Sequence, residues 1–330
     1  MTSATTTPNV PSAPNAPSAA SADAPARRSG RGGRPSDRGT GPGAWLFLAP
    51  FGIFYLAFLL GPTIWMFVAS FFNTSLVHRG LGSFAGLDNY VEMFSRADFW
   101  SSLWHTLQFT IYTVPPLVIL AFVFAVLTNR LQRGQWFFRL AFFLPFILPS
   151  ATISLIWVFI FTPATGLFAS VQSLLGFTPG SGILADPKSA MVGVAIATVW
   201  WTIGFNFILY LAGLQDIPRE LYEAAAVDGA STWQQIRHVT IPLLRRTTTL
   251  VILLQIIASL KIFDQVYLMT NGGPGISTQV SLGLITGTAF TDNRIGAASA
   301  ASVLLFIIIV AIAVIREIVE RVAARRDQEA

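Results

Sequence analysis

Six long apolar segments constrain the fold of this chain more than any other feature. Each is close to the roughly 20 residues that a helix needs to cross a lipid bilayer. They lie at about residues 44–72, 103–128, 137–161, 190–214, 247–269 and 295–315. Because backbone groups in lipid must be hydrogen-bonded within the protein, we expect an all-α membrane protein with six transmembrane helices.

The composition excludes several other classes of protein. Of the 330 residues, 53% are hydrophobic and only 11% are charged, about half the charged share of soluble domains. The absence of cysteine excludes disulfides and thiol catalysis. The three histidines are far apart in the sequence, and no nucleophile, base and acid recur together. We therefore expect no metal site and no catalytic residue.

The basic residues predict how the chain is oriented in the membrane. With the amino terminus inside, sixteen arginines fall in inner segments, four basic residues fall in outer segments, and Lys261 lies within a span. This asymmetry predicts a multi-pass protein of a bacterial-type cytoplasmic membrane with both termini in the cytoplasm. It also explains the net charge of +5, so we expect contact with the lipid bilayer and none with nucleic acid.

Two polar segments flank the apolar ones, and a third separates the first two spans. Residues 1–43 are predicted to be a disordered basic cytoplasmic tail, and residues 317–330 a cytoplasmic carboxy-terminal tail. In the outer loop, Asp88 or Asn89 is expected to cap a short helix whose apolar side carries Tyr90, Val91 and Phe94.

Residues 218–242 form the polar loop with the clearest helix signals. Asp216 is positioned to cap a helix that Pro218 enters, and Asp228-Gly229 is a turn that ends it. Ser231 then starts a second helix, with Gln234 at the spacing of a capping box. Pro242 ends or bends that second helix. The arrangement of the arginines places this helix–turn–helix in the cytoplasm.

One segment has a weak likeness to a nucleotide-binding loop. Residues 182–189 read GILADPKS, but Pro187 occupies the second glycine position and removes an N–H that a phosphate cradle needs. The segment is also expected on the outer side. We predict that this chain does not bind nucleotide.

Polar side chains recur on two spans beside aromatic rings. In the fourth span Thr198, Thr202 and Asn206 recur every four residues, with Trp201 and Phe205 adjacent. In the fifth span Gln255 and Ser259 have the same spacing. Two interpretations are open: these side chains line a path for a polyhydroxylated neutral solute, or they bind helices to one another.

Lys261 and Asp264 are charged residues near the outer end of the fifth span. Three residues apart, they could form an ion pair on one helix face, or they could belong to a gate or binding site. The spans contain no further carboxylate or histidine apart from His105 near one end, which disfavours a proton-coupled carrier.

Two motifs identify a family. Residues 223–242, EAAAVDGASTWQQIRHVTIP, resemble the EAA loop of binding-protein-dependent ABC importer permeases. Phe263 to Gly275, FDQVYLMTNGGPG, resembles the sugar-type members of that family, the maltose and glycerol-phosphate permeases. The residues that fit the EAA pattern are Glu223, Ala224, Ala225, Asp228, Gly229 and Pro242. Ile236, Val239 and Ile241 depart from the usual residues, but each change is from one apolar residue to another.

The resemblance implies a type I ABC importer permease subunit for a sugar or polyol. Such a subunit pairs with a second homologous permease and two ATPase subunits, and receives its solute from an extracytoplasmic binding protein. ATP and magnesium are then bound by the partner ATPase, with no cofactor in this chain. The EAA loop would couple ATPase closure to opening of the transport path. Residues 44–102 become the first transmembrane helix and an outer loop, and residues 103–316 an ABC transmembrane type-1 domain.

Two other functions remain as alternatives. The first is a stand-alone secondary carrier for a small polar solute, and the second is a membrane-embedded transferase. Either would work as a single chain, whereas the importer subunit would not.

Overall fold

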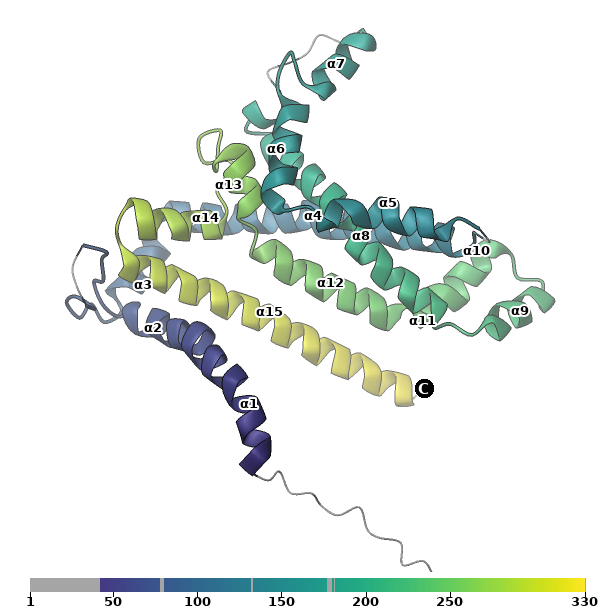
Figure 1. Ribbon diagram of the computed structural model, residues 1–330, viewed down its shortest axis with the longest axis horizontal. Helices are drawn as coiled ribbons and strands as arrows, with labels where there is room; N and C mark the ends of the chain where they lie inside the picture. Colours follow the sequence, from purple (N-terminus) through teal and green to yellow (C-terminus); the bar gives the residue numbers. More distant parts are fainter. Residues whose placement is uncertain (1–41, 78–79, 132, 177–179, 181, 330) are drawn as a thin grey trace, which may run out of the picture. The chain divides into compact units, whose positions relative to one another are not determined.

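The structure is a computed structural model that describes residues 42–77, 80–131, 133–176, 180 and 182–329. Of the tail predicted for residues 1–43, residues 1–41 lie outside the described part of the chain. The chain divides into two compact units, residues 1–55 and 56–330, which are described separately (Figure 1). Within the described residues the regular secondary structure is helical, with one isolated bridge between Phe72 and Phe84.

In the first unit the described residues form helix α1 (Pro42–Tyr55). Its rings are stacked along the helix, with the centroids of Phe51 and Tyr55 5.8 Å apart. The described side chains are largely exposed, and Phe47 is 88% exposed. An exposed, uncharged helix of this kind suits a lipid environment rather than water.

The second unit carries the remaining elements. In chain order they are η1 (Leu56–Leu60), α2 (Gly61–Ala69), α3 (Asp88–Ser95), α4 (Ala97–Asn129), α5 (Gln135–Ile147), α6 (Ser150–Phe161), α7 (Leu167–Leu174), η2 (Ile183–Ala185), α8 (Ala190–Gln215), α9 (Arg219–Val227), α10 (Thr232–Gln235), η3 (Ile236–Thr240), α11 (Ile241–Leu243), α12 (Arg245–Leu260), α13 (Asp264–Thr270), α14 (Ser281–Thr286), η4 (Gly287–Thr291) and α15 (Ile295–Glu329).

Four helical segments in the described residues are long and apolar enough to cross a membrane. They are Phe47–Ala69, Ala97–Asn129, Ala190–Gln215 and Ile295–Ile318. Two bent pairs could each add one more span: α5 with α6, bent by 97°, and Thr232–Leu243 with α12, bent by 65°. The number of candidate spans is therefore four to six, and the predicted all-helical membrane fold is confirmed at that level.

The third and fifth predicted spans are not continuous helices. The third is interrupted between α5 and α6, where Leu148 is extended with ψ 144° ahead of Pro149. Proline disfavours the helical conformation of the residue before it, so the helix stops there. The fifth is interrupted at residues 261–263, between α12 and α13. In Figure 1, α6 and α13 lie side by side after these two breaks.

The largest core of the second unit holds α4, α8 and the start of α12 together. Phe207 and Tyr210 of α8 are fully buried in it, next to Leu117 of α4 and Val251 of α12. Gly204 allows α5 to approach α8, because a Cβ at this position would lie 1.9 Å from the Phe142 carbonyl oxygen. This core fixes the helices from which the candidate site is built.

The short helix predicted in the outer loop is present as α3, but neither Asp88 nor Asn89 caps it and its buried face differs from the prediction. Asn89 and Met93 are buried, whereas Val91 is 65% exposed and Phe94 is 50% exposed. The reason is the Asn89 amide, whose Nδ2 donates to the carbonyl oxygens of Ser70 at 3.0 Å and Phe72 at 3.1 Å. These carbonyls follow α2, so the amide turns inward to satisfy them.

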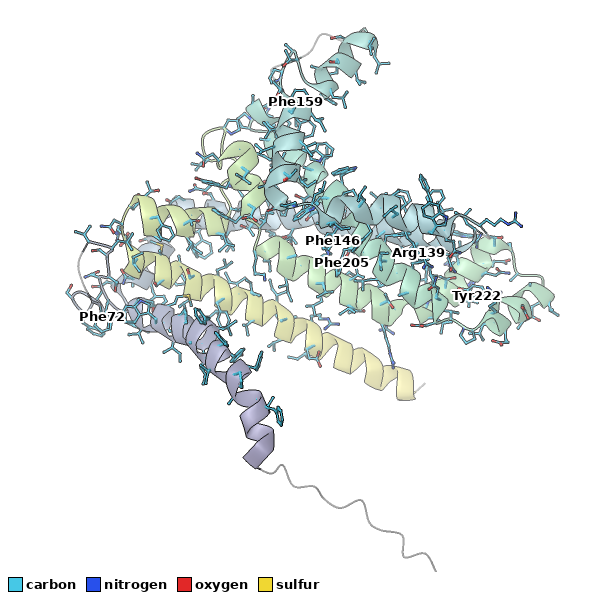
Figure 2. The ribbon with its side chains drawn as sticks, viewed as in Figure 1. Phe72, Arg139, Phe146, Phe159, Phe205 and Tyr222 are labelled. Carbon is cyan, nitrogen blue, oxygen red and sulfur yellow. The ribbon has the colours of Figure 1, made fainter. Side chains whose placement is uncertain are left out.

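Many large apolar side chains remain exposed along the helices of the second unit. Phe159 of α6, labelled in Figure 2, is 65% exposed. A soluble protein rarely exposes so many large apolar side chains, whereas lipid-facing helices require them.

Candidate coupling loop and central cavity

The cytoplasmic loop predicted at residues 218–242 forms two short helical segments joined by a turn. In Figure 1, α9, α10 and α11 lie together at the end of the second unit opposite α14. Pro218 is the residue before α9 and is extended, with ψ 135°. The prediction that Asp216 caps α9 is wrong. Asp216 is instead the helical residue that ends α8, and no side chain caps α9.

The turn after α9 is a Schellman motif. The N–H of Ala230 donates to the Ala225 carbonyl at 2.9 Å, and the N–H of Gly229 donates to the Ala226 carbonyl at 3.0 Å. Gly229 has φ +79°, in the left-handed region that glycine adopts without a steric penalty. The glycine of the EAA motif is therefore required by backbone geometry.

The predicted capping box starts the second helical segment. The Gln234 backbone N–H donates to Ser231 Oγ at 3.4 Å, and the Ser231 backbone N–H donates to Gln234 Oε1 at 2.7 Å. A hydrogen bond of 3.0 Å joins the hydroxyls of Tyr222 on α9 and Thr240 on η3. The turn, the capping box and the hydroxyl pair join the two segments into one rigid unit. The buried Leu244 connects this unit to the α4–α8–α12 core.

One face of this loop is open to a partner. Val227 is 88% exposed and Trp233 is 65% exposed, although both are apolar. Glu223, Asp228 and Gly229 are exposed as well. Among the described residues, no hydrogen bond or ion pair engages the Glu223 carboxylate. The remaining motif residues Ala224 and Pro242 are exposed, and Ala225 is half-buried.

A cavity of about 200 Å³ lies between α4, α8, α12 and α13. We call it the central cavity. Its lining residues are Phe109, Thr113, Leu117, Thr198, Trp201, Thr202, Gln255, Ala258, Ser259, Lys261, Ile262, Phe263, Asp264 and Gln265. Hydroxyl, amide and charged groups thus alternate with aromatic rings in one space.

The structure brings together seven of the nine residues predicted inside or beside a solute path. The seven that line the central cavity are Thr198, Trp201, Thr202, Gln255, Ser259, Lys261 and Asp264. Phe205 and Asn206 do not. Phe205 stacks on Phe146 of α5, with ring centroids 5.2 Å apart, and Asn206 is fully buried.

The polar pairs of the two spans do bind helices together. Gln255 of α12 donates to Asn206 Oδ1 of α8 at 2.9 Å. The hydroxyls of Ser259 of α12 and Thr110 of α4 are hydrogen-bonded at 2.9 Å. Gln255 and Ser259 also line the cavity, so for these two residues the two interpretations of the sequence are compatible.

The Trp201 side chain forms a hydrogen bond at the break between α5 and α6. Its indole N–H donates to the Leu148 carbonyl at 3.2 Å. The break removes the partner this carbonyl would have in a continuous helix, so the indole replaces a backbone donor. One side chain therefore ties α8 to the bend and also lines the cavity.

Lys261 and Asp264 are not paired on one helix face as the spacing suggested. The helix stops between them, and no salt bridge between the two is found among the described residues. Asp264 Oδ2 instead accepts a hydrogen bond from Ser150 Oγ at 3.0 Å. This bond joins the first residue of α6 to the first residue of α13, immediately beyond the two helix breaks.

Several cavity residues were missed in the sequence. The polar and aromatic ones are Phe109, Thr113, Phe263 and Gln265. On α4 a signal was present, because Thr106, Thr110 and Thr113 recur every three or four residues on one side of the helix. Within the described residues no group of three or more histidine, aspartate or glutamate side chains could hold a metal ion.

Together these features define a polytopic, all-helical membrane permease with a structured polar loop at one end of its spans. Residues 118–326 match the family model of the binding-protein-dependent transport system inner membrane component. The chain belongs to this family. It is a permease subunit of an ABC importer and not an enzyme.

Curated relatives match most of the chain. The trehalose/maltose transport system permease protein MalF of Thermococcus litoralis is 33% identical over 276 residues, which cover 82% of this chain and 91% of that protein. The sulfoquinovosyl glycerol transport system permease protein SmoG of Agrobacterium fabrum is 34% identical, and the match covers 80% of this chain and 85% of that protein. The arabinooligosaccharides transport system permease protein AraP of Bacillus subtilis is 32% identical, and the match covers 82% of this chain and 86% of that protein.

A solved structure has the same fold. A chain of the bacterial alginate ABC transporter, in complex with its alginate pentasaccharide-bound periplasmic protein, superposes with a TM-score of 0.73 at 22% identity. The match covers 83% of this chain and 92% of that one. The resemblance to importer permeases drawn from the EAA loop and the FDQVYLMTNGGPG segment is therefore confirmed. The family also favours the importer subunit over a stand-alone carrier.

Proposed function

We propose that the imported solute is a sugar or a related polyhydroxylated compound, delivered by an extracytoplasmic binding protein. The three relatives described above carry trehalose or maltose, a sulfoquinovosyl glycerol and arabinooligosaccharides in their names. The lining of the central cavity is compatible with this class. Thr202, Gln255 and Ser259 offer groups for hydroxyls, and Trp201 and Phe263 offer rings for the apolar faces of a sugar.

A second homologous permease would complete the transport path. The central cavity has a volume of about 200 Å³ in this chain. Small-molecule sites usually have roughly 300–1,000 Å³, so the cavity supplies one part of a site. The facing part is then contributed by the second permease, and the solute lies between the two subunits.

The loop of residues 218–242 would transmit the work of two ATPase subunits, which bind the ATP and magnesium. The observation that carries this proposal is the rigid loop itself, with the Schellman turn at Gly229 and the capping box at Ser231. Its exposed Val227 and Trp233 suit a protein interface, and the Glu223 carboxylate is free to meet a basic residue of the ATPase. Displacement of a rigid loop moves α8 and α12 directly.

The proposed topology has six spans with both termini in the cytoplasm. The arginine asymmetry supports this orientation, and each bent helix pair would then count as one span. Residues 44–102 would contain the first span and the outer loop, residues 103–316 the type-1 transmembrane domain, and residues 317–330 the cytoplasmic end.

The test uses the complete transporter, reconstituted with its second permease, ATPase subunits and binding protein. Replacing Gly229 with leucine forces a β-carbon into the left-handed turn, and Glu223→Gln removes the exposed charge. Both changes are expected to lower ATPase activity stimulated by the loaded binding protein, with loss of uptake. Gly176→Leu is a matched control, because Gly176 also has a positive φ, +81°, but lies after α7. Full stimulated activity in Gly229→Leu would contradict the coupling role.

Sugar specificity is tested separately with the binding protein. A panel of mono-, di- and oligosaccharides should contain a ligand that both binds to it and stimulates the reconstituted ATPase. Stimulation by amino acids or peptides alone would contradict the proposed solute class and leave the coupling role intact.

A further inference from the structure

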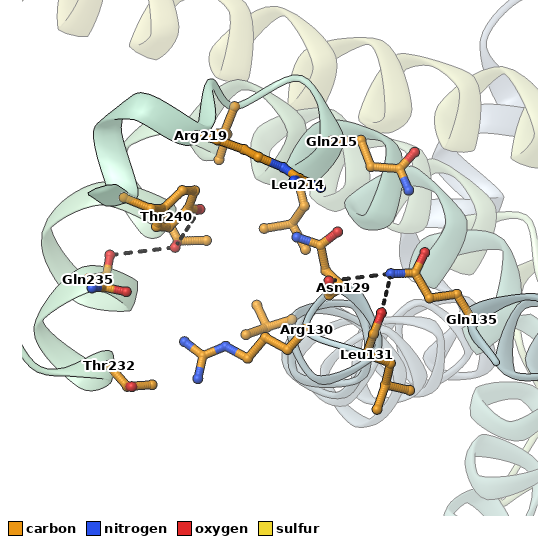
Figure 3. A pocket seen from close by; sticks show the side chains of 13 residues that line it. Asn129, Arg130, Leu131, Gln135, Leu214, Gln215, Arg219, Thr232, Gln235 and Thr240 are labelled. Carbon is orange, nitrogen blue, oxygen red and sulfur yellow. Dashed lines mark hydrogen bonds between the residues drawn. The ribbon is translucent and has the colours of Figure 1, made fainter. Parts of the chain in front are cut away.

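A second cavity in the described residues shares no lining residue with the central cavity. It has a volume of about 910 Å³ and lies behind the coupling loop, where α4 and α8 end (Figure 3). We call it the loop cavity. Its lining residues are Val126, Asn129, Arg130, Leu131, Gln135, Leu214, Gln215, Ile217, Arg219, Tyr222, Thr232, Gln235 and Thr240.

The charge of the loop cavity has one sign. Arg130 and Arg219 line it, and no aspartate or glutamate is among the lining residues. Within the described residues neither guanidinium has a hydrogen bond or an ion pair. In the view of Figure 3 the two arginines lie on opposite margins of the open space, Arg130 on the side of α4 and Arg219 at the start of α9. Two guanidinium groups facing one space are suited to bind an anion with several oxygens.

Hydrogen bonds within the chain satisfy two backbone carbonyls beside the cavity. The carbonyl oxygens of Asn129 and Leu131, at the end of α4, accept hydrogen bonds from Gln135 Nε2 at 3.4 and 2.8 Å. Arg219 is the first residue of α9, a helix of nine residues, whose amino-terminal dipole end favours negative charge. The walls are held in place by the Tyr222–Thr240 hydroxyl pair.

The position of the cavity indicates where the anion comes from. The apolar part of α4 ends at Asn129 and that of α8 at Gln215, so the cavity lies where the spans leave the lipid. Apolar side chains such as Val126 and Leu214 lie beside the arginines and amides. A phosphate with an attached glycerol fits such a mixed lining, and basic pockets between helices at the cytoplasmic surface are typical sites for anionic lipid headgroups.

The loop cavity and the exposed face of the loop use different residues. Glu223, Val227 and Trp233, which offer the exposed face of the loop, are not among its lining residues. A partner docked on that face would leave the loop cavity accessible from the membrane boundary.

We propose that the loop cavity binds a phosphate-bearing anion, such as the headgroup of an acidic phospholipid, between Arg130 and Arg219. This site goes beyond solute import, because it connects the end of α4 to the start of the coupling loop through a bound ligand. Occupancy would make the position of the loop sensitive to the anionic lipid content of the membrane.

The test uses the assembled transporter in nanodiscs of phosphatidylcholine alone or mixed with phosphatidylglycerol. Native mass spectrometry measures the phospholipid that is retained, and calorimetry with inorganic phosphate and glycerol 3-phosphate measures binding of soluble anions in the neutral nanodiscs. Arg130→Gln and Arg219→Gln are each expected to weaken anion binding by about tenfold, the effect of losing one charge-assisted hydrogen bond or more. Arg130→Lys should keep part of the binding.

Arg133→Gln is the matched control, since Arg133 lies between α4 and α5 but does not line the cavity. Retention of phosphatidylglycerol that depends on Arg130 and Arg219 identifies the lipid as the source. Arginine-dependent binding of soluble phosphate without lipid retention identifies a soluble phosphate compound. Equal binding in wild type and both glutamine variants, or a cavity that binds no anion in the assembled complex, would overturn the proposal. Size-exclusion profiles and copurification of the ATPase verify that the variants remain assembled.

Discussion

Gln255 on α12 donates a hydrogen bond of 2.9 Å to Asn206 on α8, and both residues are buried. The two side chains have different surroundings beyond this bond. Gln255 also lines the central cavity, whereas Asn206 does not. The pair therefore separates the contribution of a polar residue to helix packing from its contribution to the solute path.

Removal of the Gln255–Asn206 bond should reveal a pairwise coupling. A double-mutant cycle compares Asn206→Ala, Gln255→Ala and the double variant. An interhelical hydrogen bond in a membrane protein contributes on the order of 1 kcal/mol to stability. The two single changes should each destabilise the assembled transporter in detergent, and the double change should cost less than their sum. Thermal unfolding followed by size exclusion provides the measurement.

The same variants separate stability from solute recognition. Gln255→Ala should also raise the KM for the solute, whereas Asn206→Ala should leave the KM within about twofold, a change of less than 0.5 kcal/mol. Thr249→Ala is the control, since its hydroxyl donates only to Arg245 on its own helix. Strictly additive stabilities would show that the bond contributes nothing, and equal KM changes would remove the distinction drawn from the cavity lining.

The ion pair between Glu92 of α3 and Arg294 ahead of α15 should make the stability of the protein sensitive to acid. The two nitrogens of Arg294 donate to the two carboxylate oxygens of Glu92. This hydrogen-bonded guanidinium lowers the pKa of Glu92 below its usual value near 4.5. The pair therefore contributes stability above that usual value, and the contribution is lost as the pH falls through the lowered pKa. Because both side chains are partly exposed, we expect less than about 1 kcal/mol.

Acid unfolding of Glu92→Gln tests this relationship. The variant should be slightly less stable than the wild type near neutral pH, and the difference should vanish as the pH falls through the lowered pKa of Glu92 and its carboxylate is protonated. Asp88→Asn is the control on the same helix, because it removes a carboxylate that lies outside this ion pair. A stability difference that persists unchanged at low pH would mean that the carboxylate charge is not its cause.

Gly204 of α8 should not tolerate even alanine. A Cβ would lie 1.9 Å from the Phe142 carbonyl oxygen on α5, and the backbone at that point cannot withdraw without moving a helix. Gly204→Ala should destabilise the protein by about 1–3 kcal/mol, as overpacked cores do. Gly287→Ala is the control, since no atom lies within 4 Å of its added Cβ. Equal thermal stability of the two variants would contradict the close approach of α5 and α8.

Local chemistry explains which parts of the loop could be predicted from the sequence. The turn at Gly229 and the capping box at Ser231 depend on residues within five positions of each other, so the spacing is sufficient. Asp216 does not cap α9, because α8 continues to Gln215 and Asp216 is the residue at its carboxy-terminal end. The extended residue before α9 is Pro218.

Long-range packing explains what could not be predicted. Pro149 marks the first helix break, but no proline or glycine marks the break at residues 261–263. That break is stabilised by contacts with elements distant in the sequence: Ile262 is buried, and Asp264 reaches Ser150. Likewise, the spacing of Thr202 and Asn206 predicts one helical side, yet which residue meets the cavity depends on the position of α12 across from it.

The Ser150–Asp264 bond should control the alignment of the two broken spans beside the central cavity. Ser150→Ala removes the donor, and Asp264→Ala removes the acceptor, so both should slow uptake by a similar factor. A net hydrogen bond of about 1 kcal/mol corresponds to roughly fivefold. Asp264→Asn keeps a carbonyl oxygen that can accept from Ser150, so it should retain most of the activity if position matters more than charge. Lys261→Gln should then have an effect unrelated to that of Asp264→Asn, because the two charges are not paired.

Ser170→Ala is the control, since its hydroxyl donates only to Gly166 at the start of its own helix. Equal and severe losses in Asp264→Asn and Lys261→Gln, with normal uptake in Ser150→Ala, would instead establish the charge pair as the working element of a gate.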